Sequence, residues 1–301
     1  MMLGMIGLGR MGGHMAERLL KGGQGVVAFD LITAAIQDAV KHGAVAARSI
    51  EEVVEMLPPP RGVWVMVPAG PPTEGTIARL ADLMQPGDLI IDGGNSYYRD
   101  SIRRAAMLRE NGLHFVDVGT SGGIWGLKEG YCLMIGGEAA VVQRLRPIFE
   151  TLAPAPDKGW GHVGPNGAGH FVKMVHNGIE YGLMQAYAEG FAIMKAKKDF
   201  QLNLHTIAEI WRSGSVVRSW LLDLTAGALA RDQDLKHIKA WVEDSGEGRW
   251  TVFEAIDLNV SAPVITLALE RRLRSREEDP FADKLLAAMR QAFGGHAIKK
   301  D

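Results

Sequence analysis

The first half of the chain alternates between short apolar runs and longer amphipathic stretches, and this alternation constrains the fold most strongly. Short continuous apolar runs are typical of strands that are buried on both faces of a parallel sheet. Strands that alternate with helical patterns predict a doubly wound α/β domain. The predicted strands are residues 1–6, 25–29, 63–67, 89–91, 114–118 and 131–135, and the predicted helices are residues 11–21, 34–42, 73–84, 97–110 and 138–149.

A change of composition separates this half of the chain from the rest. Residues 154–167 contain three prolines and four glycines, which is typical of a connection between elements. Beyond it the strand patterns stop, and we predict an α/β domain over residues 1–165 and an all-helical domain over residues 166–301. The predicted helices of the second domain are residues 168–197, 204–211, 215–230, 261–274 and 280–292.

A glycine-rich turn with the spacing GxGxxG joins the first predicted strand to the first predicted helix. In this context the glycines permit a tight turn and let a pyrophosphate approach the N-terminus of the helix. The alternative interpretation is a structural glycine turn. We predict that the turn binds a dinucleotide through Gly7, Leu8, Gly9, Arg10, Met11 and Gly12.

The second predicted strand ends at Asp30, near the position where an acid binds a ribose hydroxyl in such domains. A carboxylate repels the 2′-phosphate of NADP, which usually requires an arginine nearby. Residues 31–33 are Leu, Ile and Thr and supply no cation. We therefore predict that NAD is preferred over NADP, although a solvated aspartate is the alternative reading of Asp30.

Composition and charge argue against several classes of protein. The formal net charge of −2 provides no general attraction to nucleic acid or to an anionic membrane. No apolar run approaches the roughly 20 residues that cross a bilayer, and no charged leader precedes the first strand. Cys132 is the single cysteine, so no internal disulfide can form, and we expect a cytoplasmic protein.

Two loops follow predicted strands at the edge of the sheet where ligands bind in such domains. Asn95 lies in the first loop and could contact both a nicotinamide ribose and a substrate. Ser121, Gly122 and Gly123 form the second loop, whose N–H groups and hydroxyl could hold a carboxylate. Taken alone, the first loop is better explained as an Asx turn, and the second loop is equally consistent with a flexible turn.

Polar residues at helical spacing interrupt the apolar run that starts at Gly167. Lys173, Asn177, Glu180 and Tyr181 would share one stripe of a helix. Burial would lower the pKa of a lysine and raise that of a glutamate, so the pair could act as base and acid. The alternative is a buried helix that contains a structural Lys–Glu ion pair.

Together these motifs resemble those of the 6-phosphogluconate dehydrogenase (decarboxylating) family, in its short form. That family belongs to the β-hydroxyacid dehydrogenases. The resemblance spans essentially the whole chain. The motifs that carry it are GLGRMG at 7–12, MVPAG at 66–70, DGGNSYY at 92–98, SGG at 121–123, GHFVKMVHNGIEYGLMQ from 169, DSGEGRWT from 244 and FGGH at 293–296.

The resemblance implies that NAD, or less readily NADP, oxidises 6-phosphogluconate at C3. The product then loses carbon dioxide and becomes ribulose 5-phosphate, a step of the pentose phosphate pathway and of gluconate utilisation. Lys173 would be the base, Glu180 the acid and Asn177 a residue that holds substrate and nicotinamide in register. No metal is required.

The resemblance also assigns binding residues and a partner. The resemblance implies a homodimer or homotetramer. In the family an arginine and a histidine near the C-terminus, here Arg290 and His296, reach the active site of a neighbouring subunit. The implied cofactor contacts are Val67, Pro68, Ala69 and Asn95, and the implied substrate contacts are Asn95, Ser121, Gly122, Gly123, His176, Asn177, Tyr181, Arg271, Arg290 and His296.

The chain departs from the longer relatives in two ways. Ser245 stands where they have a phosphate-binding lysine, and a second helical repeat is missing. A gluconate or 3-hydroxyisobutyrate type of dehydrogenase is therefore an alternative, and so is a non-catalytic dinucleotide sensor. The glutamate–tyrosine pair at 180–181 and the FGGH tail favour the 6-phosphogluconate type over the 3-hydroxyisobutyrate type, and the presence of Lys173, Asn177 and Glu180 together argues against a sensor.

Overall fold

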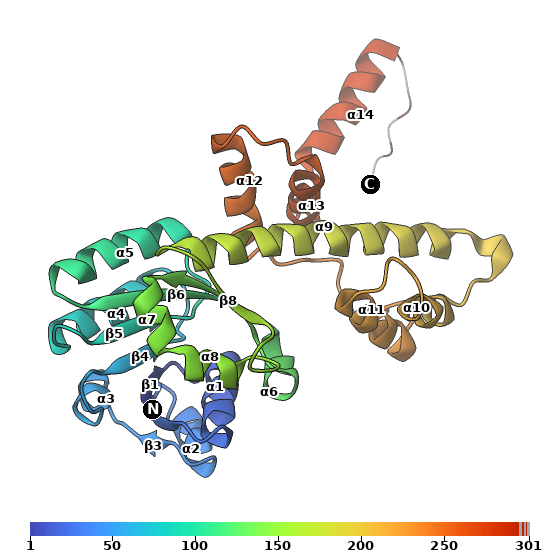
Figure 1. Cartoon of the computed structure of the whole chain (residues 1–301). Coiled ribbons are helices and arrows are strands. Elements are labelled where there is room, and N and C mark those ends of the chain that lie inside the picture. The colour runs from blue at the N-terminus through green and yellow to red at the C-terminus, as the bar shows by residue number, and fades with distance from the viewer. Residues whose placement is uncertain (295–296, 298, 300–301) are drawn as a thin grey trace. The chain divides into compact units, whose positions relative to one another are not determined.

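A computed structural model describes residues 1–294, 297 and 299, and it confirms an α/β domain followed by helices (Figure 1). The chain divides into two compact units, Met1–His176 and Asn177–Asp301. The division falls within the long helix α9 (Ala168–Ala196), which begins in the first unit. The boundary predicted after residue 165 lies just before this helix and stays a prediction.

The first unit contains one eight-stranded sheet in the order β3-β2-β1-β4-β5-β6-β7-β8. Every neighbouring pair is parallel except β6 and β7, which are antiparallel. The direction of the strand order reverses between β1 and β4, which is where such sheets bind ligands. The strands are β1 (Met2–Ile6), β2 (Gly25–Phe29), β3 (Val45–Ala46), β4 (Gly62–Val65), β5 (Leu89–Asp92), β6 (His114–Ser121), β7 (Cys132–Gly137) and β8 (Trp160–Gly164).

Each face of the sheet has its own apolar core. In β1, Leu3 and Met5 enter one core and Ile6 enters the other, because successive side chains of a strand point to opposite faces. Both faces must therefore be covered by helices. The first core includes residues of α1 (Arg10–Lys21), α2 (Thr33–Lys41), α7 (Ala139–Arg144) and α8 (Arg146–Leu152), and the second includes residues of α3 (Ile50–Glu55), α4 (Pro71–Leu83) and α5 (Tyr98–Glu110).

Several elements differ from the sequence prediction. The helix predicted over residues 138–149 is two helices, α7 and α8, because Pro147 has no N–H to donate inside a continuous helix. Strand β8 lies within the predicted connection, at the edge of the sheet, where partial exposure removes the apolar pattern. The short elements β3, α3, η1 (Gly123–Trp125) and α6 (Gly126–Glu129) are too brief to produce a periodic pattern.

The described residues of the second unit form helices joined by loops, without a strand, and they contain two apolar clusters. One cluster joins Phe191 of α9 to α10 and α11, and the other joins Tyr181 of α9 to α12 and α13. The sequence prediction missed α12. No described helix combines the length and the apolar composition of a bilayer span. The helices are η2 (Lys198–Phe200), α10 (Leu204–Arg212), α11 (Trp220–Arg231), α12 (Glu247–Asp257), α13 (Pro263–Arg274) and α14 (Phe281–Gly294).

Candidate active site

The glycine turn between β1 and α1 requires glycine at two positions and leaves space at a third. A Cβ on Gly7, where φ is +92°, would lie 2.5 Å from the Met66 carbonyl oxygen, and one on Gly12 would lie 2.1 Å from the Gly7 oxygen. A Cβ on Gly9 would meet no described atom within 4 Å. Within the described residues no side chain caps α1, so its first N–H groups can receive a pyrophosphate.

Asp30 lies directly after β2 and its carboxylate connects that strand to the glycine turn. The backbone N–H of Leu8 donates to Asp30 Oδ2 at 2.6 Å, and that of Ile32 donates to Oδ1 at 2.8 Å. The side chain of Leu31 is 92% exposed. A carboxylate fixed here fits the ribose of NAD, and the following residues bring no cation toward a 2′-phosphate.

The loop after β4 lies beside the glycine turn. The N–H of Met66 donates to the Ile6 carbonyl at 2.7 Å, and the Thr73 hydroxyl donates to the Pro68 carbonyl at 2.8 Å. Pro68 and Ala69 are exposed and Val67 is half-buried. These residues therefore lie at the carboxyl ends of β1 and β4, as the predicted cofactor contacts require.

The loop that carries Asn95 is held by a buried ionic network that the sequence prediction missed. Asp92, at the end of β5, accepts hydrogen bonds from Ser96 Oγ at 2.7 Å and Arg104 Nη1 at 3.2 Å. Arg104 is 1% exposed and also donates to Glu74 at 2.8 Å. The hydrogen bond from Arg103 lowers the pKa of Glu74 to about 2, so Glu74 stays ionised and compensates Arg104.

The loop after β6 requires its glycines. Gly122 has φ +132° and Gly123 has φ +52°, which side chains rarely allow. Ser121 is the last residue of β6 and pairs with Cys132 of β7. Ser121, Gly122 and Gly123 therefore lie together at the carboxyl end of β6.

Helix α9 packs its first turns directly against β6 and β7. A Cβ on Gly119 would lie 2.4 Å from Lys173 Cβ, and one on Gly169 would lie 2.5 Å from the carbonyl oxygens of Asp117 and Met134. Only glycine allows this close approach of helix and sheet. Lys173 is therefore held over Gly119 of β6, and Gly119 lies two residues before Ser121.

The polar stripe of α9 lies on one continuous helix, as the spacing predicted. Lys173 and Asn177 are only 8% and 9% exposed, whereas the apolar Ile179 is 53% exposed. Glu180 is half-buried, and so is His176. Polar residues that are more buried than their apolar neighbours indicate a binding or catalytic site rather than a solvated surface.

Tyr181 is surrounded by groups from two other helices of the second unit. The guanidinium carbon of Arg272 lies 3.4 Å from the Tyr181 ring centroid, and a Cβ on Gly248 would lie 2.3 Å from Tyr181 Cε2. The buried Tyr181 hydroxyl has no hydrogen-bond partner among the described residues. Arg271, the residue chosen from the sequence, is exposed, and Arg272 is the neighbour that contacts the tyrosine.

Of the two predicted tail residues, Arg290 lies in the described part of the chain. Arg290 lies exposed on α14, and His296 lies outside the described residues. The prediction that Arg290 and His296 act together at a substrate site therefore stays a prediction.

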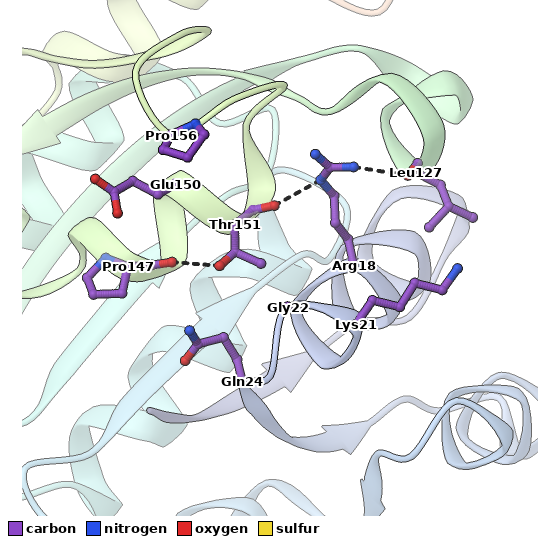
Figure 2. A pocket seen from close by; sticks show the side chains of 9 residues that line it. All are labelled: Arg18, Lys21, Gly22, Gln24, Leu127, Pro147, Glu150, Thr151 and Pro156. Atoms are coloured by element: carbon purple, nitrogen blue, oxygen red, sulfur yellow. Dashed lines mark hydrogen bonds between the residues drawn. The ribbon is translucent and has the colours of Figure 1, made fainter.

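A hollow of about 550 Å³ in the first unit is not part of this site (Figure 2). It lies at the end of α1 away from the glycine turn. Arg18 donates there to the carbonyl oxygens of Thr151 at 2.9 Å, Leu127 at 3.2 Å and Ala153 at 2.6 Å. Those bonds tie α1 to its neighbours, and Arg18 acts as a structural residue.

The fold and the glycine turn define a nicotinamide-dinucleotide-binding dehydrogenase. Residues 2–164 match the NAD binding domain of 6-phosphogluconate dehydrogenase, and residues 169–286 match the C-terminal domain of 6-phosphogluconate dehydrogenase. The chain belongs to the 6-phosphogluconate dehydrogenase family.

Similar proteins agree with this assignment. The NAD(+)-dependent, decarboxylating 6-phosphogluconate dehydrogenase of Haloferax volcanii is 41% identical over 100% of this chain and 99% of its own length. The Plasmodium falciparum 6-phosphogluconate dehydrogenase superposes with a TM-score of 0.85 at 28% identity, over 100% of this chain and 66% of that one. A 3-hydroxyisobutyrate dehydrogenase from Salmonella typhimurium, at 22% identity and TM-score 0.75 over 89% and 92% of the chains, shares the fold.

Proposed function

We propose that this protein oxidises 6-phosphogluconate with NAD and releases carbon dioxide and ribulose 5-phosphate. The observation that carries the proposal is a buried lysine, Lys173, fixed over the carboxyl end of β6 beside the loop of Ser121. Similarity over the full length of the NAD-dependent Haloferax enzyme supports the same reaction and cofactor.

Lys173, which is 8% exposed, is the proposed base that takes the proton of the C3 hydroxyl, a step that needs its neutral amine. NAD, when bound, accepts the hydride from C3. The protonated Lys173 then hydrogen-bonds the new carbonyl oxygen, which draws electrons from the breaking bond as carbon dioxide leaves. Glu180, two turns along α9, protonates the carbon that lost carbon dioxide. Asn177 holds the substrate in register.

The substrate phosphate is proposed to bind at Tyr181 and Arg272. The buried, unpartnered hydroxyl of Tyr181 can donate to a phosphate oxygen, and Arg272 supplies a fixed positive charge over its ring. Arg272 thus takes the role that the sequence prediction assigned to Arg271. Ser121, Gly122, Gly123, Asn95 and His176 are proposed to hold the rest of the substrate.

A homo-oligomer, dimer or tetramer, is proposed because apolar side chains gather on exposed helix faces. On α14 the exposed fractions are 75% for Phe281, 45% for Leu285 and 47% for Met289, at helical spacing. Such an apolar stripe could pack against a second copy of the chain, and Arg290 on the same helix would then lie near that copy. His296 is proposed to act with Arg290.

We also propose a cytoplasmic location. The proposed domains are residues 1–165 and 166–301, and the matched regions 2–164 and 169–286 support these bounds.

The decisive experiment measures NADH formation with 6-phosphogluconate, gluconate and 3-hydroxyisobutyrate, with carbon dioxide measured in parallel. We expect turnover and stoichiometric carbon dioxide with 6-phosphogluconate. Higher kcat/KM with gluconate or 3-hydroxyisobutyrate would assign the protein to that substrate instead. Binding of NAD without turnover of any of the three would indicate a sensor.

A further inference from the structure

Asp117 lies in the middle of β6 and is 0% exposed. Its Oδ1 accepts the backbone N–H of Gly167 at 2.7 Å, and its Oδ2 accepts that of His170 at 3.0 Å. Both N–H groups belong to the start of α9, where the first turn lacks partners within the helix. Gly167 has no side chain that could cap the helix, so the cap comes from the neighbouring strand. An anionic cap at this end is also favoured by the helix dipole.

The cap lies close to the proposed base along both the helix and the strand. His170, whose N–H Asp117 holds, precedes Lys173 by about one helical turn. Gly119 is two residues beyond Asp117 on the same face of β6, and a Cβ there would lie 2.4 Å from Lys173 Cβ. Strand β6 thus caps the start of α9 through Asp117 and contacts Lys173 through Gly119.

We propose that Asp117 is a positioning residue for Lys173. By holding the first turn of α9 against β6, its carboxylate sets where the amine meets the C3 hydroxyl of the substrate. The inference rests on the proposed function, since it takes Lys173 as the base. Asp117 itself is fully buried, and each of its oxygens binds a backbone N–H, so it acts through the helix without touching substrate.

The test is Asp117→Asn. Asparagine keeps the shape and one acceptor oxygen, but its NH₂ group faces a backbone N–H and breaks half of the cap. We expect kcat to fall about 10- to 100-fold, which is the order expected of a base displaced by about 1 Å. The KM for 6-phosphogluconate and the Kd for NAD should stay within about threefold, because uniform binding is retained. The deuterium isotope effect on kcat, with substrate deuterated at C3, should rise as hydride transfer becomes the slowest step.

Asp88→Asn is the matched control. Asp88 is 1% exposed and accepts the backbone N–H groups of Arg61 at 2.6 Å and Gln85 at 3.0 Å, in the same unit as Asp117. It also accepts a hydrogen bond from the Arg61 guanidinium at 3.1 Å, so its substitution disturbs folding at least as much as that of Asp117. We expect a comparable loss of Tm while kcat stays within about twofold, because the catalytic groups are not displaced. Equal changes of kcat in the two variants would overturn the proposal.

A second variant keeps the proposal testable if Asp117→Asn does not fold. Gly119→Ala forces Lys173 away from β6 without changing charge, and an unchanged kcat in the folded variant would equally overturn the positioning role. The activity of the wild-type protein separates the proposed function from the proposed role of Asp117. Failure to turn over 6-phosphogluconate contradicts the proposed function, whereas normal turnover with an unaffected Asp117→Asn contradicts only the role of Asp117.

Discussion

Lys173 is 8% exposed on the same helix that leaves Ile179 53% exposed. A methionine of similar length could fill this buried position, so the removal of the amine should cost activity more than stability. We predict that Lys173→Met lowers kcat by about 10² to 10⁴, the usual contribution of a general base, and leaves the Kd for NAD unchanged in a fluorescence titration. Turnover near that of the wild type would reject Lys173 as the base.

Glu180 should affect a later step. Glu180→Gln is expected to impair reprotonation of the enediol while hydride transfer continues, because the amide cannot supply the proton. Rapid-quench analysis should then show an NADH burst in the first turnover that exceeds the ribulose 5-phosphate released. A parallel loss of both products would place Glu180 elsewhere in the reaction.

Asp30 contributes to cofactor choice through its fixed carboxylate. A hydrogen bond to a charged group contributes about 1.5–3 kcal/mol, so Asp30→Ala should raise the KM for NAD about 10- to 100-fold. The kcat/KM ratio of NAD to NADP should fall, since the repulsion of the 2′-phosphate is removed with the carboxylate. An unchanged ratio would show that other residues select the cofactor.

At the scale of elements, α9 provides a matched pair of glycines. Gly169→Ala should destabilise the protein by about 1–3 kcal/mol, because its Cβ would lie 2.5 Å from two carbonyl oxygens of the sheet. Gly190→Ala, whose Cβ meets no described atom within 4 Å, should stabilise the same helix by about 0.5–1 kcal/mol. Urea unfolding measures both, and shifts of the same sign would contradict the packing of α9 on β6 and β7.

The elements themselves were predicted unevenly from the sequence. Strands buried on both faces, such as β1 and β2, leave uninterrupted apolar runs, and α9 has enough turns for its pattern to be recognised. Strand β8 and helix α12 were missed. Edge strands and helices that mix buried and exposed apolar residues lack such a pattern, because their burial depends on neighbours that are remote in the sequence.

At the scale of the whole molecule, Arg290 should act in a second copy if the tail reaches a neighbouring site. Lys173→Met and Arg290→Ala should each be inactive alone. After the two are unfolded and refolded together, about one quarter of wild-type activity should return, since half of random dimers are hybrids with one intact site. No recovery, with hybrids verified by mass, would place Arg290 in its own subunit's site.

The sequence by itself determined the doubly wound domain, the dinucleotide turn and the polar stripe of α9. These depend on residues that are near each other in the chain, through the spacing of strands, glycines and helix turns. Only the tertiary structure decided that Arg272 contacts Tyr181 and that Asp117 holds the start of α9. Asp117 lies 50 and 53 residues before the N–H groups it binds, and Tyr181 lies far along the chain from α13. Local spacing carries no information about which distant side chains meet, because that choice follows from how whole elements pack.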